Sequence, residues 1–314
     1  MNIVQRAEQF PKTDPYPTRT KETESIGPRE DPVLWRKWQE GAPVTRGQAL
    51  HYKTKGYLVC KDLFAKDEID QLIETSAALR AGSGHIRSED LVTEPGSDAV
   101  RTIFRLDEHS ALFARLAADT RLADVARFLL DDEVYLHQSR LNYKPGFTGK
   151  EFYWHSDFET WHAEDGMPRM RAVSASILLT DNSALNGPLL LIPGSHRYFI
   201  ACQGETPDAN HKSSLKNQVV GVPSREILES LAAEHGLDAA TGPAGTVVFF
   251  ECNTLHASNG NVTPFPRSNA FFVYNAMSNK PVAPFAAARP RPAFLANRSA
   301  IRAVAPVQGS LIAG

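Results

Sequence analysis

Residues 134–143 read VYLHQSRLNY, a strand-forming run without Gly or Pro. Alternate residues of a strand point to the same face, so Gln138, Arg140 and Asn142 stand side by side. Core strands normally carry apolar residues there, and this face is therefore predicted to line a polar site inside the protein. The alternative is a strand edge that faces solvent. Similar short runs, separated by Gly, Pro, Asn or Asp, follow at residues 172–180, 188–193, 246–251 and 270–275.

Helical periodicity flanks these strands without alternating one-for-one with them. This order argues against a doubly wound parallel sheet and favours an antiparallel sandwich or jelly roll, a mainly β fold with flanking helices (α+β). Ser110 and Ser224 stand where N-caps are expected, and Gly82 follows the end of another helical pattern. The predicted helices are residues 31–40, 66–81, 110–130 and 224–235.

The chain divides into an N-terminal arm and one domain. Residues 1–30 are polar and rich in Pro and charge, so they are predicted to lie on the body as an arm or to be disordered. Residues 31–314 form a single domain: a helical layer mainly at 31–131, a jelly-roll core at about 133–280 and an irregular covering tail at 281–314. The long polar stretch 201–223 is typical of a lid or binding loop.

Composition limits the partners and the compartment. Hydrophobic residues make up 42% and charged residues 22% of 314 residues, as in ordinary globular chains, and the net charge of −2 offers no field for nucleic acid or anionic lipid. Three cysteines without a CxxC pair suggest neither a disulfide framework nor a cysteine zinc site. Without an apolar segment typical of a signal peptide or membrane span, a cytoplasmic protein is expected. The oligomeric state stays open, a homodimer being among the states allowed.

The chemistry is concentrated in residues 152–172, FYWHSDFETWHAEDGMPRMRA. His155 and Asp157 are two residues apart, a spacing that points both side chains to one side of an extended backbone. His256 follows an apolar strand and could supply a third ligand from a neighbouring antiparallel strand. Two histidines and one carboxylate form the metal-binding triad of non-haem Fe(II) oxygenases. The alternative is that His155 and Asp157 only hydrogen-bond to each other in a turn.

The position of Arg267 makes the interpretation of the triad more specific. It comes shortly after His256, at the entrance to the strand of residues 270–275. An arginine there can bind a carboxylate through two charge-assisted hydrogen bonds, at the far end of a keto acid that chelates the metal. The combination indicates a 2-oxoglutarate-dependent dioxygenase, although Arg267 alone would be interpreted as an ordinary surface charge.

The run FxWHSDFETWHxEDGMPxMRA resembles the signature of the ectoine hydroxylases, a branch of the phytanoyl-CoA-hydroxylase-like dioxygenases. The resemblance extends to HQSRLNYKPGF at 137–147, to NTLHASNGN around His256 and to PRSNAFFVYN at 266–275. It therefore covers most of the chain from about residue 130 to residue 280.

This resemblance implies a double-stranded β-helix, or cupin-like jelly roll, that binds Fe(II), 2-oxoglutarate and O₂. The implied reaction converts ectoine, 2-oxoglutarate and O₂ into 5-hydroxyectoine, succinate and CO₂, as part of compatible-solute metabolism. The implied residues are His155, Asp157 and His256 for iron, Arg267 for the distal carboxylate of 2-oxoglutarate, Phe152, Asn142 and Ser176 for the rest of that pocket, and Gln138, Thr160 and Trp161 for ectoine.

The residues support this substrate independently. Ectoine carries a carboxylate and a delocalised amidinium cation, so its pocket should combine hydrogen-bond donors with aromatic faces. Residues 152–161 are rich in aromatic side chains, and about half of these are expected to pack in the core. Arg140 and Arg291 could bind the substrate carboxylate, although arginines on a Pro-rich tail are usually solvated. His162, Glu164 and Asp165 are predicted to form a polar loop rather than to support the metal ligands.

Three other functions fit parts of the pattern. A related dioxygenase would hydroxylate another small zwitterion, such as a proline. A non-catalytic jelly-roll protein would bind a metal or ligand but would need neither Arg267 nor the polar face of residues 134–143. A zinc hydrolase could use the same three ligands, but no general base stands beside them in the sequence.

Overall fold

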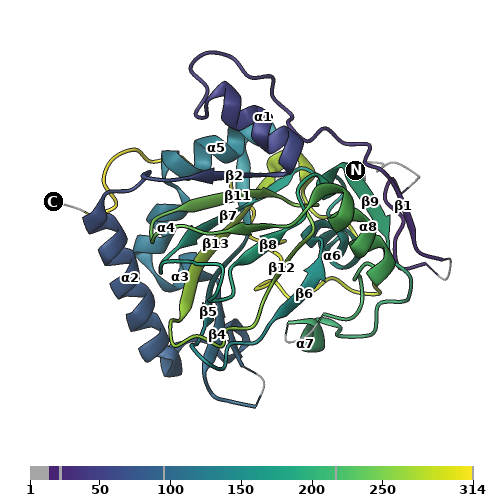
Figure 1. The fold of residues 1–314 in the computed structure, drawn as a ribbon. Coiled ribbons are helices and arrows are strands. Elements are labelled where there is room, and N and C mark those ends of the chain that lie inside the picture. Colours follow the sequence, from purple (N-terminus) through teal and green to yellow (C-terminus); the bar gives the residue numbers. More distant parts are fainter. Residues whose placement is uncertain (1–13, 21–22, 95, 216–217, 313–314) are drawn as a thin grey trace, which may run out of the picture.

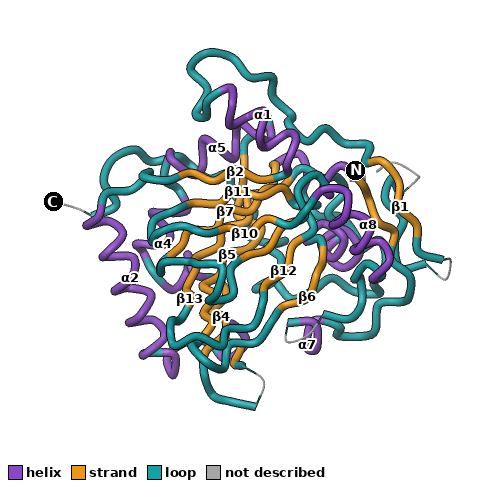
Figure 2. Tube along the Cα trace, viewed as in Figure 1, coloured by secondary structure: helices purple, strands orange, loops and turns teal. Residues whose placement is uncertain are grey.

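A computed structural model describes residues 14–20, 23–94, 96–215 and 218–312. Two antiparallel sheets form its centre (Figures 1 and 2). Apolar side chains of both sheets, among them Leu191 of one and Phe250 of the other, pack into a shared cluster. The larger sheet has the order β2 (Tyr57–Cys60), β11 (Val247–Glu251), β7 (Ala172–Leu178), β13 (Arg267–Ala276), β5 (Val134–Lys144), β4 (Val100–Phe104) and β3 (Leu91–Thr93). The smaller has the order β10 (Asp238–Ala240), β8 (Leu189–Leu191), β12 (His256–Ser258) and β6 (Phe152–His155). This arrangement confirms the predicted antiparallel jelly roll.

Helices cover the outer face of the larger sheet (Figure 1). The apolar face of α5 packs on β13, β7 and β5, and Phe272 and Tyr274 point from the sheet into this helical core. Successive residues of a strand face opposite sides, so Phe271 points instead between the sheets.

The helices are α1 (Arg46–Lys55), α2 (Lys66–Ala81), α3 (Leu106–His109), α4 (Ala111–Ala117), α5 (Thr120–Leu130), α6 (Asp157–Thr160), α7 (His211–Ser214) and α8 (Arg225–His235). Short 3₁₀ turns lie at Ser83–His85, Ser88–Asp90, Ser195–Arg197 and Met277–Asn279.

Local signals predicted several helix boundaries correctly. Helix α2 covers the predicted residues, and the Gly82 amide closes it on the Ala78 carbonyl at 2.8 Å. The side chains of Ser110 and Ser224 accept hydrogen bonds from backbone amides at the starts of α4 and α8. These caps satisfy amides that have no partner inside the helix.

Two helix predictions were wrong. Residues 31–40 form no helix, because the Asp31 carboxylate accepts hydrogen bonds from the Tyr16 hydroxyl and the Met170 amide instead of capping one. The predicted helix at 110–130 is two helices. The side chain of Asp119 caps α5 by accepting from the Arg121 amide, and the Thr120 amide donates to the Val307 carbonyl of the C-terminal tail.

Strands also begin earlier than predicted. The segment expected to be mainly helical contributes β2 to one edge of the larger sheet and β4 and β3 to the other. These strands have only three to five residues each. Such runs are too short to establish a period of two in the sequence, and their pairing with β11 and β5 stabilises them.

Irregular segments cover the rest of the molecule. Residues 1–13 of the predicted arm lie outside the described residues, but Tyr16 is buried, and β1 (Ser25–Pro28) pairs with β9 (Tyr198–Ala201). The described arm therefore lies on the body. Residues 281–312 follow the surface without a helix or a named strand, as predicted, and bury Leu295. Among the described residues, no helix is both long enough and apolar enough to cross a membrane.

Candidate active site

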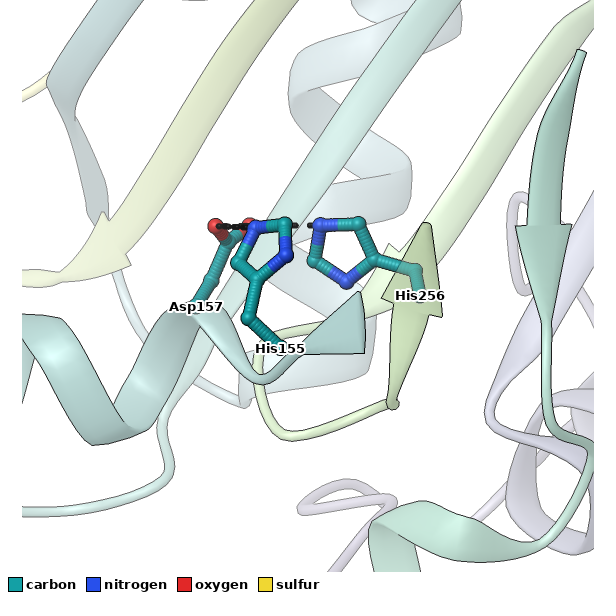
Figure 3. Close-up of side chains that lie close together, drawn as sticks. All are labelled: His155, Asp157 and His256. Carbon is teal, nitrogen blue, oxygen red and sulfur yellow. Dashed lines mark ion pairs between the residues drawn. The ribbon is translucent and has the colours of Figure 1, made fainter. Parts of the chain in front are cut away.

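The three predicted metal ligands meet at one end of the smaller sheet (Figure 3). His155 ends β6, Asp157 starts α6 and His256 starts β12. Strands β6 and β12 are antiparallel neighbours in which His155 and His256 are direct partners, as the sequence predicted. One ligand atom from each of the three side chains lies within 4.8 Å of the others, and all three residues are buried.

Hydrogen bonds orient both imidazoles for metal binding. His155 Nδ1 lies 2.8 Å from the Tyr153 carbonyl oxygen and His256 Nδ1 lies 2.9 Å from the Thr254 carbonyl oxygen, so each Nδ1–H donates to the backbone. The Nε2 lone pairs then face Asp157 Oδ1, at 3.7 and 3.8 Å.

Protonation and unsatisfied atoms also fit a cation at this position. Burial, followed by the neighbouring His256, lowers the pKa of His155 to about 3, which keeps the imidazole neutral as a metal ligand must be. Asp157 Oδ2 is buried without a hydrogen-bond partner among the described residues. Two neutral histidines and one carboxylate are the donor set that suits Fe(II) in non-haem oxygenases.

A cavity opens beside the triad, between the two sheets. Gln138, Arg140 and Asn142 line it from β5. Strand β5 is paired with β13 on one side and β4 on the other, so it is not an edge strand. The polar face of residues 134–143 therefore lines the interior site, as predicted, and the alternative of a solvent-facing edge was wrong.

Arg267 is a buried cation at one end of this cavity. It is the first residue of β13 and only 5% exposed. Its Nη1 donates to the Gly187 carbonyl at 2.7 Å, while its Nε has no partner among the described residues. Burial, followed by Arg101 and Arg140, lowers its pKa to about 10. A buried guanidinium without a carboxylate partner favours an anionic ligand, and the distal carboxylate of 2-oxoglutarate fits this need.

The other residues predicted for the cosubstrate pocket do not all reach the cavity. Asn142 lines it and accepts a hydrogen bond from Thr102. Phe152 lines it too, with its ring 4.9 Å from that of His155. Ser176 does not line it; the hydroxyl is buried and accepts a hydrogen bond from the Asn269 amide at 3.2 Å.

Polar side chains also surround the opposite end of the cavity, termed the substrate end because the residues predicted to contact the substrate lie there. Gln138 donates to the Leu295 carbonyl at 2.7 Å and accepts from Arg140. The guanidinium of Arg140 lies 4.7 Å from the centre of the Phe271 ring, also in the cavity wall. Thr160 and Trp161 line the cavity at the end of α6 and the start of the next helix.

The side chain of Arg291 is only 8% exposed, so it is not solvated as is usual for a tail arginine. It lines the cavity, and its Nε and Nη2 donate to the two carboxylate oxygens of Asp165 at 2.8 and 2.5 Å. This pairing holds the guanidinium in one orientation, with Nη1 left for a ligand.

Comparison with known proteins identifies the family. Residues 52–269 match the phytanoyl-CoA dioxygenase (PhyH) family. The ectoine dioxygenase of Sphingopyxis alaskensis is 54% identical over 299 residues, which are 95% of this chain and 98% of the relative. The chain belongs to the ectoine dioxygenases of the PhyH family. The ectoine dioxygenase of Halomonas elongata is 49% identical and matches over 93% of this chain and 88% of the relative.

Solved structures agree with this family. The crystal structure of EctD from S. alaskensis with 2-oxoglutarate and 5-hydroxyectoine has 50% sequence identity and a TM-score of 0.88, covering 96% of this chain and 100% of that one. A structure of EctD from the same organism with bound Fe has 49% identity and a TM-score of 0.86, with the same coverage.

One segment of this ectoine dioxygenase family member differs from the sequence prediction. His162, Glu164 and Asp165 form no polar loop but a buried π-helix, Trp161–Asp165. His162 Nδ1 lies 2.8 Å from the Met167 carbonyl and its ring stacks on Phe285. Buried ion pairs satisfy the two carboxylates, so the polar residues indicate interior contacts rather than solvent.

Sequence analysis also missed two cations beside Arg267. Lys144 lines the cavity, is 5% exposed and donates to Ser258 Oγ at 2.9 Å. Burial, followed by Arg267 and Arg101, lowers its pKa to about 6. Arg101 also lines the cavity and forms an ion pair with Glu94. Lys144 lies two residues beyond Asn142 on the same strand face, so extending the predicted strand by one residue would have found it.

Proposed function

We propose that this chain hydroxylates ectoine to 5-hydroxyectoine, consuming 2-oxoglutarate and O₂ and releasing succinate and CO₂. One observation carries the proposal: a single cavity contains both a complete two-histidine, one-carboxylate triad and, at one end, the buried guanidinium of Arg267 without a carboxylate partner among the described residues. A metal-binding protein without turnover has no need for this second feature. The family's named activity and the 5-hydroxyectoine bound to EctD support the choice of substrate.

His155, Asp157 and His256 would hold Fe(II). The bound metal supplies the activation of O₂ that couples decarboxylation of the keto acid to hydroxylation of a C–H bond. The Tyr153 and Thr254 carbonyls orient the two imidazoles so that each Nε2 is free to face the metal position. With only three protein groups holding the metal, positions would stay open for the cosubstrate and O₂.

Arg267 would bind the distal carboxylate of 2-oxoglutarate, with Asn142 and Phe152 beside it. Arg101 adds positive charge to the same end of the cavity, and Lys144 does so when it is protonated. Ser176, which the family resemblance implies for this pocket, would act through Asn269, the residue to which its hydroxyl is hydrogen-bonded. A dianionic cosubstrate is thereby favoured over a keto acid without the second carboxylate.

Ectoine would bind at the substrate end, against Thr160, Trp161 and Gln138. Arg291 offers Nη1 to the ectoine carboxylate while Asp165 holds its other two nitrogens. The indole of Trp161 offers an aromatic face to the amidinium cation, and Arg140 contributes a further cation in the cavity wall. Binding here would place one ring C–H bond toward the metal and exclude water from the site.

A reconstitution experiment tests this function. The purified chain is loaded anaerobically with Fe(II) and 2-oxoglutarate, O₂ and ectoine are added, and succinate and 5-hydroxyectoine are quantified by mass spectrometry. Equal amounts of both products are expected, with neither formed by His155→Ala. Proline replaces ectoine in a parallel reaction. Efficient hydroxylation of proline with no 5-hydroxyectoine from ectoine would contradict the proposed substrate.

A further inference from the structure

Arg19 of the N-terminal arm is a fully buried cation that reaches the substrate end of the fold. Its Nε and Nη2 donate to the two carboxylate oxygens of Glu159, at 2.9 and 2.8 Å, and its Nη1 donates to Glu164 at 2.6 Å. The side chain of Arg19 is 0% exposed and both glutamates are 3% exposed. Two-pronged pairing between planar groups fixes orientation as well as distance, and desolvated partners are held more tightly than exposed ones.

The two glutamates belong to the segment that forms the cavity wall. Glu159 lies in α6 and directly precedes Thr160, while Glu164 lies in the π-helix that starts with Trp161. Thr160 and Trp161 line the cavity, but Arg19 does not. Arg19 therefore contacts the back of the wall whose front faces the substrate.

A third segment, the loop at residues 202–221 in the parts that the structure describes (202–215 and 218–221), is hydrogen-bonded to the same residues. Arg19 Nη1 donates to Thr206 Oγ1 at 3.0 Å, and Asn210 donates to Glu164 at 2.8 Å. Gln218, which lines the cavity, donates to Thr160 Oγ1 at 3.2 Å. The predicted binding loop thus reaches the cavity through Gln218, while Thr206 and Asn210 of the same loop are hydrogen-bonded to Arg19 and Glu164.

Close packing and backbone conformation show how tightly these segments fit. Arg19 has a left-handed φ of +53°, which non-glycine residues rarely adopt and which surrounding contacts must maintain. Gly221 has a φ of +73°, and a Cβ there would lie 2.1 Å from Glu159 Oε2 and 2.6 Å from Arg19 Nη2. The loop can approach the ion pair only because residue 221 has no side chain.

We propose that Arg19 is a positioning residue for ectoine hydroxylation, which fixes Thr160 and Trp161 against the substrate and fastens the 202–221 loop over the cavity. This inference rests on the proposed function. Arg19 acts through its hydrogen bonds to Glu159, Glu164, Thr206 and, at 3.5 Å, Thr160 Oγ1. Its loss should therefore loosen ectoine while the metal ligands and the 2-oxoglutarate pocket keep their own contacts. A substrate held loosely is hydroxylated less often for each 2-oxoglutarate that is decarboxylated.

The first test compares Arg19→Lys with Arg29→Lys. Arg29 is another arm arginine, with a side chain only 5% exposed, but its ion pair is with Glu251 at the end of β11, which does not line the cavity. For Arg19→Lys, the KM for ectoine should rise about tenfold and the ratio of succinate to 5-hydroxyectoine should rise from near one to two or more, while the KM for 2-oxoglutarate stays within about twofold. Arg29→Lys should lower the melting temperature but leave the ratio near one.

The second test does not depend on whether an arginine variant folds. Gly221→Ala places a methyl group against the Arg19–Glu159 pair, whereas Gly204→Ala introduces the same residue at another left-handed glycine of the loop with nothing within 4 Å. Gly221→Ala should raise the KM for ectoine and the succinate ratio, and Gly204→Ala should leave both unchanged.

Each outcome decides one proposal. Ratios near one in Arg19→Lys and Gly221→Ala would overturn the role of Arg19, as would equal changes in the matched controls, because these would indicate general loosening. A wild-type chain that decarboxylates 2-oxoglutarate without forming 5-hydroxyectoine would instead overturn the proposed function.

Discussion

The two ends of the cavity are held in place by different means. At the metal and cosubstrate end, the side chains of His155, His256 and Arg267 are oriented by main-chain carbonyls, and all three residues belong to paired strands. At the substrate end, Thr160, Trp161 and Arg291 lie outside the sheets and are fixed by buried ion pairs and hydrogen bonds from the arm, the 202–221 loop and the C-terminal tail.

This difference separates the chemistry from the choice of substrate. Sheet hydrogen bonds fix the two histidine ligands of the metal regardless of what lies at the other end, while Asp157 follows directly at the start of α6. The substrate end can change through irregular segments that carry no ligand. Variants at the first end should therefore remove iron or weaken 2-oxoglutarate binding, whereas variants at the second should lower the share of 2-oxoglutarate turnovers that yield 5-hydroxyectoine.

The largest effect is expected at the triad. His155→Ala removes one of three protein ligands, so 5-hydroxyectoine formation should fall by at least roughly a thousandfold and bound iron should be lost. Iron content by mass spectrometry and product formation are measured on the same sample, with exposed His85→Ala as the control. Full iron content and activity in His155→Ala would show that the metal is bound elsewhere.

Arg267→Ala should have the next largest effect. Losing a charge-assisted pair with the cosubstrate removes about 1.5–3 kcal/mol, which raises the KM for 2-oxoglutarate by one to two decades. The KM for ectoine should change little. Arg36→Ala, which breaks an exposed ion pair with Asp131, is the matched control. An unchanged dependence on 2-oxoglutarate would assign the carboxylate to another residue.

Trp161→Ala tests the substrate end. Trp161 is 2% exposed and also lines the cavity, so both stability and coupling should suffer. Truncating a buried Trp costs about 3–5 kcal/mol, and succinate should exceed 5-hydroxyectoine a few-fold. Melting temperature and product ratio are compared with those of Trp38→Ala, a partly exposed residue outside the cavity. A destabilised variant with a product ratio near one would show that Trp161 acts as a core residue and not as a substrate contact. The contrast between the two ends would then lose its support.

The smallest effect concerns pH at the cosubstrate end. The pKa of Lys144 is lowered to about 6, so the group is largely neutral at pH 8 and gains its charge as the pH falls toward 6. A charged Lys144 attracts dianionic 2-oxoglutarate, and the affinity should therefore fall severalfold between pH 6 and pH 8. Anaerobic calorimetry of the Fe(II)-loaded protein measures it. Lys144→Met should flatten this pH dependence of the affinity. A variant with the same pH profile as the wild type would exclude a contribution from Lys144.

Local patterns predicted which residues line the cavity, but they did not predict the contacts that hold its far end in place. The alternation in residues 134–143 acts within one strand, where the sequence period fixes direction, and His155 and Asp157 are close neighbours in the chain across the end of β6. The pairs of Arg19 with Glu159 and of Arg291 with Asp165 join residues more than a hundred positions apart. Such contacts leave no local period, and the buried π-helix was therefore interpreted as a polar loop. The short strands β2, β3 and β4 were missed because tertiary pairing, not their own sequence, stabilises them.

The covering tail has a consequence for synthesis. Ribosomes make Gln138, the iron ligands and Arg267 before Arg291 and Leu295, the tail residues that complete the substrate wall and bind Gln138. Every strand of both sheets likewise precedes the tail in the order of synthesis. A chain cut short near residue 280 would keep all three groups for iron but would lack the Arg291 and Leu295 contacts at the substrate end. Such a chain is expected to bind iron but to position ectoine poorly.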